Sequence, residues 1–121
     1  MNMRQLRLDL WLPPVVLMGV IFAFSAQPSL DSGLGLIDLI GRKIIHFAEY
    51  ALLCFLWWRA FAGRTTRTGA LVAAAVLSVA YAITDEWHQT FIEGRHGTPV
   101  DVVIDSVGIA AACVWLRRRD E

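Results

Sequence analysis

An uncharged run of 21 residues near the N-terminus, Leu10 to Leu30, constrains this chain more than any other feature. A helix needs about 20 residues to cross the hydrocarbon core of a bilayer, which is about 30 Å thick. The chain as a whole is apolar too, since 56% of its 121 residues are hydrophobic and 18% are charged. This composition is too apolar for a soluble or disordered chain of this length and indicates a membrane protein.

A cleaved signal peptide is the alternative interpretation of this run, because Arg4 and Arg7 precede it and small residues lie near its end. The run is, however, long for the apolar part of a signal peptide, and it contains Pro13 and Pro14. We therefore expect a helix that stays in the mature protein.

Apolar segments recur three more times along the chain, and polar turns rich in Gly, Pro, Ser or Thr separate them. The second segment contains Glu49 and the fourth contains Asp101 and Asp105, whereas the third carries no charge from Thr68 to Thr84. We predict an all-α fold, an integral membrane four-helix bundle that forms a single domain over residues 1–121. Its spans are expected at about 10–30, 44–61, 68–87 and 99–116.

The positive charges predict the orientation of the bundle, because cytoplasmic segments of membrane proteins hold the excess of Lys and Arg. Eight of the eleven Lys and Arg residues lie in the N-terminal segment, the middle loop at 59–67 and the C-terminal tail. We therefore expect both termini on the cytoplasmic side. Eight of the eleven Asp and Glu residues lie at or just below the opposite, predicted outer face.

Net charge excludes one class of function, and the positions of the cysteines favour one interpretation of them. Eleven Lys and Arg balance eleven Asp and Glu, so the chain lacks the basic excess with which a protein neutralises nucleic-acid phosphates, and we exclude DNA and RNA as partners. Cys54 and Cys113 lie in separate apolar segments. We interpret them as small buried hydrophobic residues rather than as a disulfide or a zinc pair.

Polar side chains gather at the predicted outer ends of all four spans. Ionisable groups inside or at the edge of a span are costly, and they usually face the interior of a bundle or a water-filled cavity. We therefore predict one functional site at the outer leaflet. Its candidate residues are Ser25, Gln27, Arg42, Lys43, His46, Glu49, Tyr50, Asp85, Glu86, His88, Gln89, Arg95, Asp101 and Asp105.

Helical spacing places these residues on defined faces. His46 and Glu49 are separated by three positions and share one face of the second span with Arg42. Asp105 is followed on its own face by Gly108, and such small residues let a neighbouring helix approach closely. Ala112 continues this small face. We expect the acids of the fourth span to point into the bundle rather than toward lipid.

Three charged strings in the outer region carry a resemblance to a known family. They are RKIIHFAEY at 42–50, DEWHQTFIEGR at 85–95 and DVVIDSVG at 101–108, and FSAQPS at 24–29 precedes them. Together they resemble the VanZ-like family of small bacterial membrane proteins, whose polar signature falls on the candidate residues above and on Gly94. Two departures lie in the outer loop: Glu93 stands where the family commonly has proline, and His96 follows the arginine.

The resemblance implies a multi-pass protein of the bacterial cell (inner) membrane with a role in the cell envelope. The family takes its name from a protein that gives low-level resistance to teicoplanin, a lipoglycopeptide that acts outside the membrane. The resemblance carries no biochemical activity over to this chain.

A binding module is our first functional hypothesis. The outer site would bind or intercept an envelope ligand or a lipoglycopeptide, and its partners would be membrane lipid, a lipid-linked envelope intermediate or the antibiotic. The ligand-binding candidates are Ser25, Gln27, Arg42, Lys43, Tyr50, Glu86, Gln89 and Arg95.

A membrane-embedded enzyme that acts on a lipid-linked envelope intermediate is the alternative, and the sequence leaves open whether the chain is an enzyme. In this hypothesis His46 or His88 is a general base or nucleophile, and Glu49 or Asp85 orients its imidazole. No GxSxG nucleophile motif is present. The catalytic candidates are His46, Glu49, Asp85, His88, Asp101 and Asp105.

Three further interpretations stay open. The pairs His46 with Glu49 and Asp85 with His88 each put an imidazole and a carboxylate on one helical face, which is a weak metal signal, so metal and cofactor remain unassigned. A small ion or proton carrier would use Glu49 and Asp105, although no polar residues continue through the inner half of the spans. The acids and bases could also form purely structural ion pairs between helices or with a partner protein.

Overall fold

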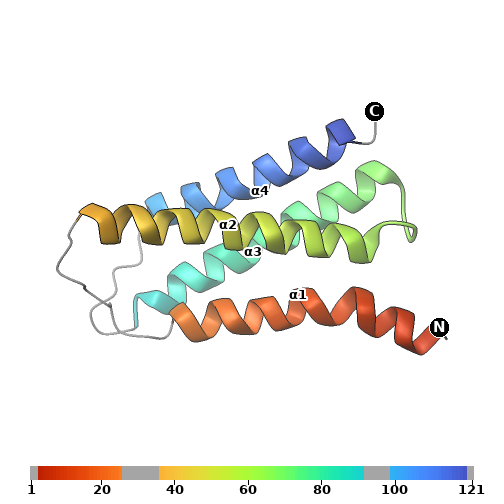
Figure 1. Cartoon of the computed structure of the whole chain (residues 1–121), viewed down its shortest axis with the longest axis horizontal. Helices are drawn as coiled ribbons and strands as arrows, with labels where there is room; N and C mark the ends of the chain where they lie inside the picture. The colour runs from red at the N-terminus through yellow and green to blue at the C-terminus, as the bar shows by residue number, and fades with distance from the viewer. Residues whose placement is uncertain (1–2, 26–35, 92–98, 120–121) are drawn as a thin grey trace.

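The protein is a bundle of four helices, described by a computed structural model over residues 3–25, 36–91 and 99–119. The described residues contain no β-strand, so the predicted all-α fold is confirmed. The helices lie side by side along the long axis of the molecule (Figure 1). They are α1 (Met3–Ser25), α2 (Leu36–Phe61), α3 (Arg67–Gln89) and α4 (Pro99–Arg119).

Three of the helices contain segments that are long and apolar enough to cross a membrane: Arg7–Phe24, Ile40–Phe61 and Arg67–Gln89. Their surfaces agree with a lipid environment, because large apolar side chains such as Phe24 and Val76 are more than 60% exposed. The end of the predicted first span, 26–30, lies outside the described residues. The predicted fourth span falls on α4 and stays a prediction.

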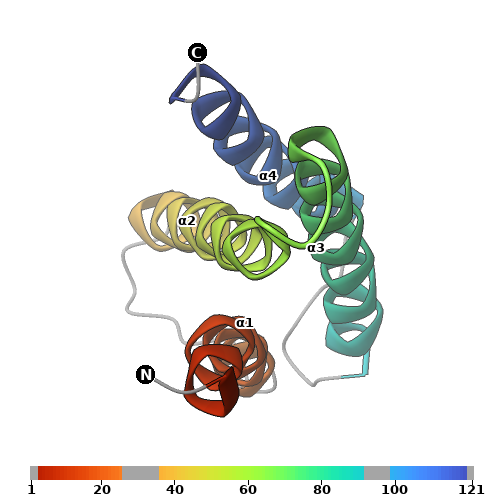
Figure 2. The same ribbon diagram turned by 90° about the vertical axis from the view of Figure 1, so that its right-hand side faces the viewer.

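The helix α2 is the centre of the bundle. It contacts α1, α3 and α4, while α3 also contacts both α1 and α4. In the end-on view of Figure 2, α1 and α4 lie on different sides of α2. The start of α1, the turn between α2 and α3 and the end of α4 are all at the same end of the bundle (Figure 1). The three segments with the excess of positive charge therefore lie together.

The turn between α2 and α3 follows from its sequence, AGRTT at 62–66. Gly63 has a φ of 86°, a left-handed conformation that glycine adopts without steric cost. Thr66 then caps α3, because its hydroxyl accepts a 3.0 Å hydrogen bond from the backbone N–H of Gly69. This short connection fixes α2 and α3 as antiparallel neighbours.

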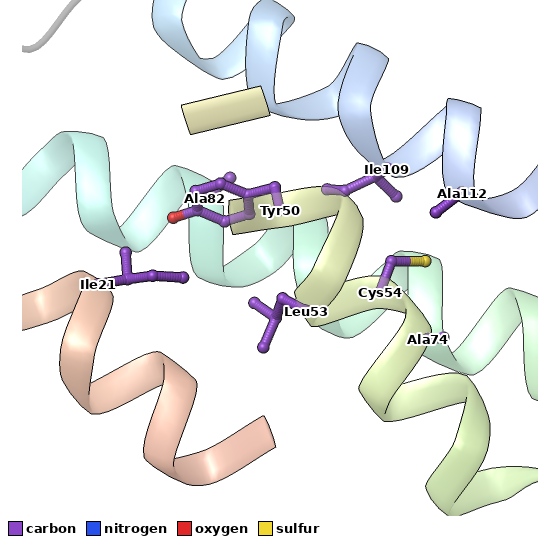
Figure 3. Packing of buried hydrophobic residues seen from close by; sticks show 8 residues of the cluster. All are labelled: Ile21, Tyr50, Leu53, Cys54, Ala74, Ala82, Ile109 and Ala112. Atoms are coloured by element: carbon purple, nitrogen blue, oxygen red, sulfur yellow. The ribbon is translucent and has the colours of Figure 1, made fainter. Parts of the chain in front are cut away.

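The core lies along α2 and is built largely from small and medium-sized side chains. Leu53 and Cys54 of α2 are fully buried, as are Ile21 of α1 and Ala74 of α3 (Figure 3). Tyr50, Ala82, Ile109 and Ala112 complete the cluster in Figure 3.

Gly108 of α4 lets the backbones of α4 and α2 come close together. A Cβ atom added at this position would lie 2.5 Å from the carbonyl oxygen of Phe47 in α2, far inside van der Waals contact. The predicted role of Gly108 in close helix packing is therefore confirmed. The contact draws together the polar halves of α2 and α4.

Candidate functional site

The polar site lies at the end of the bundle opposite the two chain termini, and α2 supplies most of its side chains. Three of the four residues concerned contact an acid of α3 or α4, and the fourth, Glu49, lies within electrostatic range of those acids. They are Lys43, His46, Glu49 and Tyr50.

His46 and Asp105 form the contact between α2 and α4. The Nδ1 atom of His46 lies 3.4 Å from Oδ1 of Asp105, which is an ion-pair distance, and the Asp105 side chain is completely buried. Asp105 lies one helical turn before Gly108, so the close packing of the two backbones brings the carboxylate to the imidazole. The sequence places the two residues on polar faces of two different helices, and the structure shows that these two faces are in contact.

Tyr50 and Asp85 form the contact between α2 and α3. The Tyr50 hydroxyl donates a 3.1 Å hydrogen bond to Oδ2 of Asp85, and the exposed fractions of the two residues are 0% and 2%. Tyrosine suits this position, because its ring packs in the apolar core while its hydroxyl reaches the Asp85 carboxylate.

Lys43 and Asp101 form a third pair, nearer the end of the bundle. The Nζ atom of Lys43 lies 2.6 Å from Oδ1 of Asp101, and both side chains are partly exposed. This pair forms the rim above the buried contacts of His46 and Tyr50. Its long, flexible lysine is suited to reach the interface.

Glu49 lies close enough to both buried contacts to feel their charges, and it is attracted to the imidazole of His46 and repelled by the carboxylates of Asp85 and Asp105. We call these five residues the polar cluster: His46, Glu49, Tyr50, Asp85 and Asp105. The cluster contains three carboxyl groups and one imidazole, so acceptors outnumber donors.

Two buried carboxyl groups of the polar cluster have unused hydrogen-bonding capacity. Oδ1 of Asp85 and both carboxyl oxygens of Asp105 have no hydrogen-bond partner within the part of the chain that the structure describes, although Oδ1 of Asp105 lies at ion-pair distance from His46. Buried polar atoms are nearly always hydrogen-bonded in proteins, and each exception needs a physical reason. These oxygens are therefore the candidate hydrogen-bond acceptors for a ligand.

The remaining candidates lie around the polar cluster or outside the described residues. The ring of His88 packs against Phe22 of α1, with 4.5 Å between ring centroids, so His88 faces α1. Glu86 and Gln89 are buried at the end of α3, and Arg42 is partly buried at the start of α2. Gln27, Arg95 and the side chain of Ser25 lie outside the described residues.

The described residues contain no group of three or more His, Cys, Asp or Glu side chains arranged to hold a metal ion. Of the pairs suggested by the sequence, His46 with Glu49 lies in the polar cluster, whereas Asp85 is separated from His88, whose ring packs against Phe22 of α1. We therefore assign no metal site to this region.

Sequence reasoning missed two contacts across the bundle. The thiols of Cys54 and Cys113 lie 3.7 Å apart, although the two residues come from different predicted spans. The Arg59 side chain donates a 2.7 Å hydrogen bond to the carbonyl oxygen of Asp9. The second contact had a signal in the sequence, because Pro13 lacks the N–H that normally bonds this carbonyl in a helix.

Comparison with known proteins agrees with the membrane fold. The VanZ/LLP1 family model matches residues 10–118, which include the whole polar cluster. No curated protein and no solved structure matches the chain.

Proposed function

The chain belongs to the VanZ/LLP1 family, and from this premise we propose that it is a binding protein of the bacterial inner membrane. Its polar cluster holds the polar part of an envelope ligand, which is a lipid-linked envelope intermediate or a lipoglycopeptide such as teicoplanin. The apolar part of such a ligand lies in the bilayer beside the helices.

The observation that carries the proposal is the set of unused carboxylate oxygens on Asp85 and Asp105. A ligand with ammonium, amide or hydroxyl groups supplies the donors that the described part of the cluster lacks. Hydrogen bonds to a charged acceptor are stronger than neutral ones, and a low dielectric constant strengthens them further. The three carboxyl groups therefore favour a ligand that presents donors or a positive charge.

The distribution of charge supports an outward-facing site. The eight Lys and Arg residues at the other end of the bundle favour the cytoplasm for that end. The polar cluster then opens toward the outer leaflet, where envelope intermediates and lipoglycopeptides are found. Arg42, Lys43 and, in the outer loop, Arg95 are suited to bind a phosphate or carboxylate of the same ligand.

Catalysis is the second candidate function, and the contact of His46 with Asp105 is the observation that favours it. A buried carboxylate beside Nδ1 fixes the orientation of an imidazole and leaves Nε2 to accept a proton. In this case the ligand is a lipid-linked intermediate that His46 activates as a general base. Asp105 takes the orienting role that the sequence suggested for Glu49 or Asp85.

An ion carrier receives no comparable support. Below the polar cluster the buried side chains include Leu53, Ala74, Ile109 and Leu116, which cannot relay a proton. Among the described residues below the polar cluster, Ser78 is a buried polar side chain, and a single hydroxyl does not make a proton relay. We therefore do not propose a transport function.

The proposal is tested by neutral substitutions in the polar cluster. We expect His46→Gln, Asp85→Asn and Asp105→Asn to abolish the effect of the protein on teicoplanin susceptibility of a bacterial host, while the protein still accumulates in the membrane. Asp9→Asn is the matched control, because Asp9 is an exposed acid at the opposite end of the bundle. Full resistance in all three cluster variants would contradict the proposal.

Binding and catalysis are then separated by mass spectrometry of envelope lipids from cells with and without the protein. A lipid product that disappears in His46→Gln supports the enzyme. Unchanged lipids, together with teicoplanin binding to the purified protein in nanodiscs, support the binding module.

A further inference from the structure

We propose that Cys54 and Cys113 are a dithiol that a bilayer-soluble oxidant of the quinone class converts to a disulfide, which cross-links α2 to α4. This modification site is independent of the ligand proposed for the polar cluster. It rests on a contact between two thiols that lie in different helices and that the described chain leaves unbridged.

The geometry already brings the two sulfur atoms together. The Sγ atoms are 3.7 Å apart, and a disulfide bond is about 2.05 Å long, so the sulfurs must approach by roughly 1.7 Å. Cys54 lies on the side of α2 that faces Ile109 and Ala112 of α4 (Figure 3). Both backbones are held close by the contact between Gly108 and Phe47, and Cys113 follows Gly108 by little more than one helical turn.

The surroundings select the oxidant. Cys54 is completely buried, whereas Cys113 is partly exposed on the surface of α4, next to the exposed apolar side chains of Val114 and Trp115. A reagent that reaches Cys113 from this surface arrives through the hydrocarbon region, which excludes polar oxidants. An apolar quinone dissolves there and accepts hydrogen from thiols.

The reaction balances as a two-electron oxidation. Both S–H bonds break, one S–S bond forms, and the two protons and two electrons pass to the quinone, which becomes a hydroquinone. The disulfide closes a loop that contains all of α3 and joins the two helices that carry His46 and Asp105. Oxidation therefore fixes the spacing of the helices that form the polar cluster.

The experiment uses the full-length protein in detergent micelles and a fully substituted, micelle-soluble benzoquinone, which takes up the two hydrogens as a hydroquinone. After treatment the protein is unfolded, alkylated with a maleimide and weighed by mass spectrometry. We expect a monomer that has lost both reactive thiols together, with a mass lower by two hydrogen atoms. Dithiothreitol should restore both thiols.

The matched control moves one thiol to the opposite face of α4 at nearly the same depth. The double variant Cys113→Ser with Ala111→Cys keeps two thiols, but Ala111 is exposed on another side of the helix. We expect it to form no intramolecular disulfide under conditions that oxidise the wild type. Oxidation of this control at the wild-type rate, or wild-type thiols that survive the quinone while those of the unfolded chain do not, would overturn the proposal.

Discussion

At the scale of single residues, the buried acids of the polar cluster persist because donors from α2 meet them. Leaving a buried carboxylate without its hydrogen-bond partner typically costs about 1–3 kcal/mol, and more when the partner was itself charged. Asp105 is completely buried and lies beside His46, and Asp85 is almost completely buried and accepts a hydrogen bond from Tyr50. These contacts are therefore parts of the fold as well as of the proposed site.

The Tyr50 hydroxyl gives the first prediction. Tyr50→Phe keeps the ring in the core but removes the donor to Asp85, whose other oxygen has no partner among the described residues. We expect the free energy of unfolding to fall by about 1–3 kcal/mol. Tyr81→Phe is the matched control, because the Tyr81 hydroxyl donates to the neutral backbone carbonyl of Met18. Unfolding in mixed micelles should show the smaller loss for Tyr81→Phe, and equal losses would contradict this account of Asp85.

Gly108 gives the second prediction. Gly108→Ala places a methyl group against the Phe47 carbonyl and pushes α2 and α4 apart, and overpacking of this kind typically costs about 1–3 kcal/mol. The control is Gly19→Ala, because nothing lies within 4 Å of a Cβ at that position. It should leave stability unchanged or raise it by up to about 1 kcal/mol through helix propensity. Thermal unfolding of both variants in the same detergent measures the difference, and a stable Gly108→Ala protein would refute the tight contact.

At the scale of helices, α1 continues through Pro13 and Pro14 because another helix satisfies its backbone. Pro13 has no N–H to donate to the carbonyl oxygen of Asp9, four residues earlier. The Arg59 side chain of α2 donates to this oxygen at 2.7 Å. A gap in the hydrogen bonding of one helix thus becomes a contact between two helices.

A double-mutant cycle tests this contact and is the third prediction. Arg59→Met should cost about 1 kcal/mol in the wild type, because it leaves the Asp9 carbonyl without its donor. In the Pro13→Ala background the new backbone N–H bonds this carbonyl, and the same Arg59→Met change should cost less. Unfolding free energies of the four proteins give the coupling, and an equal cost in both backgrounds would show that Arg59 acts elsewhere.

The positions of the helices could be predicted from the sequence, but the pairing of their polar faces could not. Hydropathy and turn residues mark the apolar part of each helix, since both are local properties, but α1 and α2 begin earlier, at Met3 and Leu36, than the predicted spans at about 10 and 44. The spacing of Asp85 and His88 places them on one broad face, yet one meets Tyr50 and the other packs on Phe22. The rotation of α3 about its own axis decides which neighbouring helix each of these two side chains meets. Such rotations depend on packing between distant segments, such as Gly108 on α4 against α2.

At the scale of the whole molecule, the distribution of charge along the bundle axis predicts its orientation in the membrane. The start of α1, the 62–66 turn and the end of α4 lie together at one end (Figure 1), and this end carries most of the Lys and Arg residues. The polar cluster lies toward the other end. The net charge of zero is therefore the sum of one end rich in basic residues and another rich in acidic residues.

Cysteine labelling of cells tests the orientation and is the fourth prediction. In a background that lacks Cys54 and Cys113, Gly97→Cys should react with a membrane-impermeant maleimide added outside intact cells. Thr66→Cys should react after the membrane is opened but not before. The reverse pattern would turn the polar cluster toward the cytoplasm and remove the basis for an envelope ligand.

Three polar contacts run from α2 to a later helix: Lys43 to Asp101, His46 to Asp105 and Tyr50 to Asp85. Since a chain is synthesised from its N-terminus, α2 is made before α3 and α4. Each of these three acids is therefore synthesised after the α2 residue that it contacts in the folded protein. In a circular permutation that placed α2 last, the same three acids would be synthesised before the donors that they meet in the folded bundle.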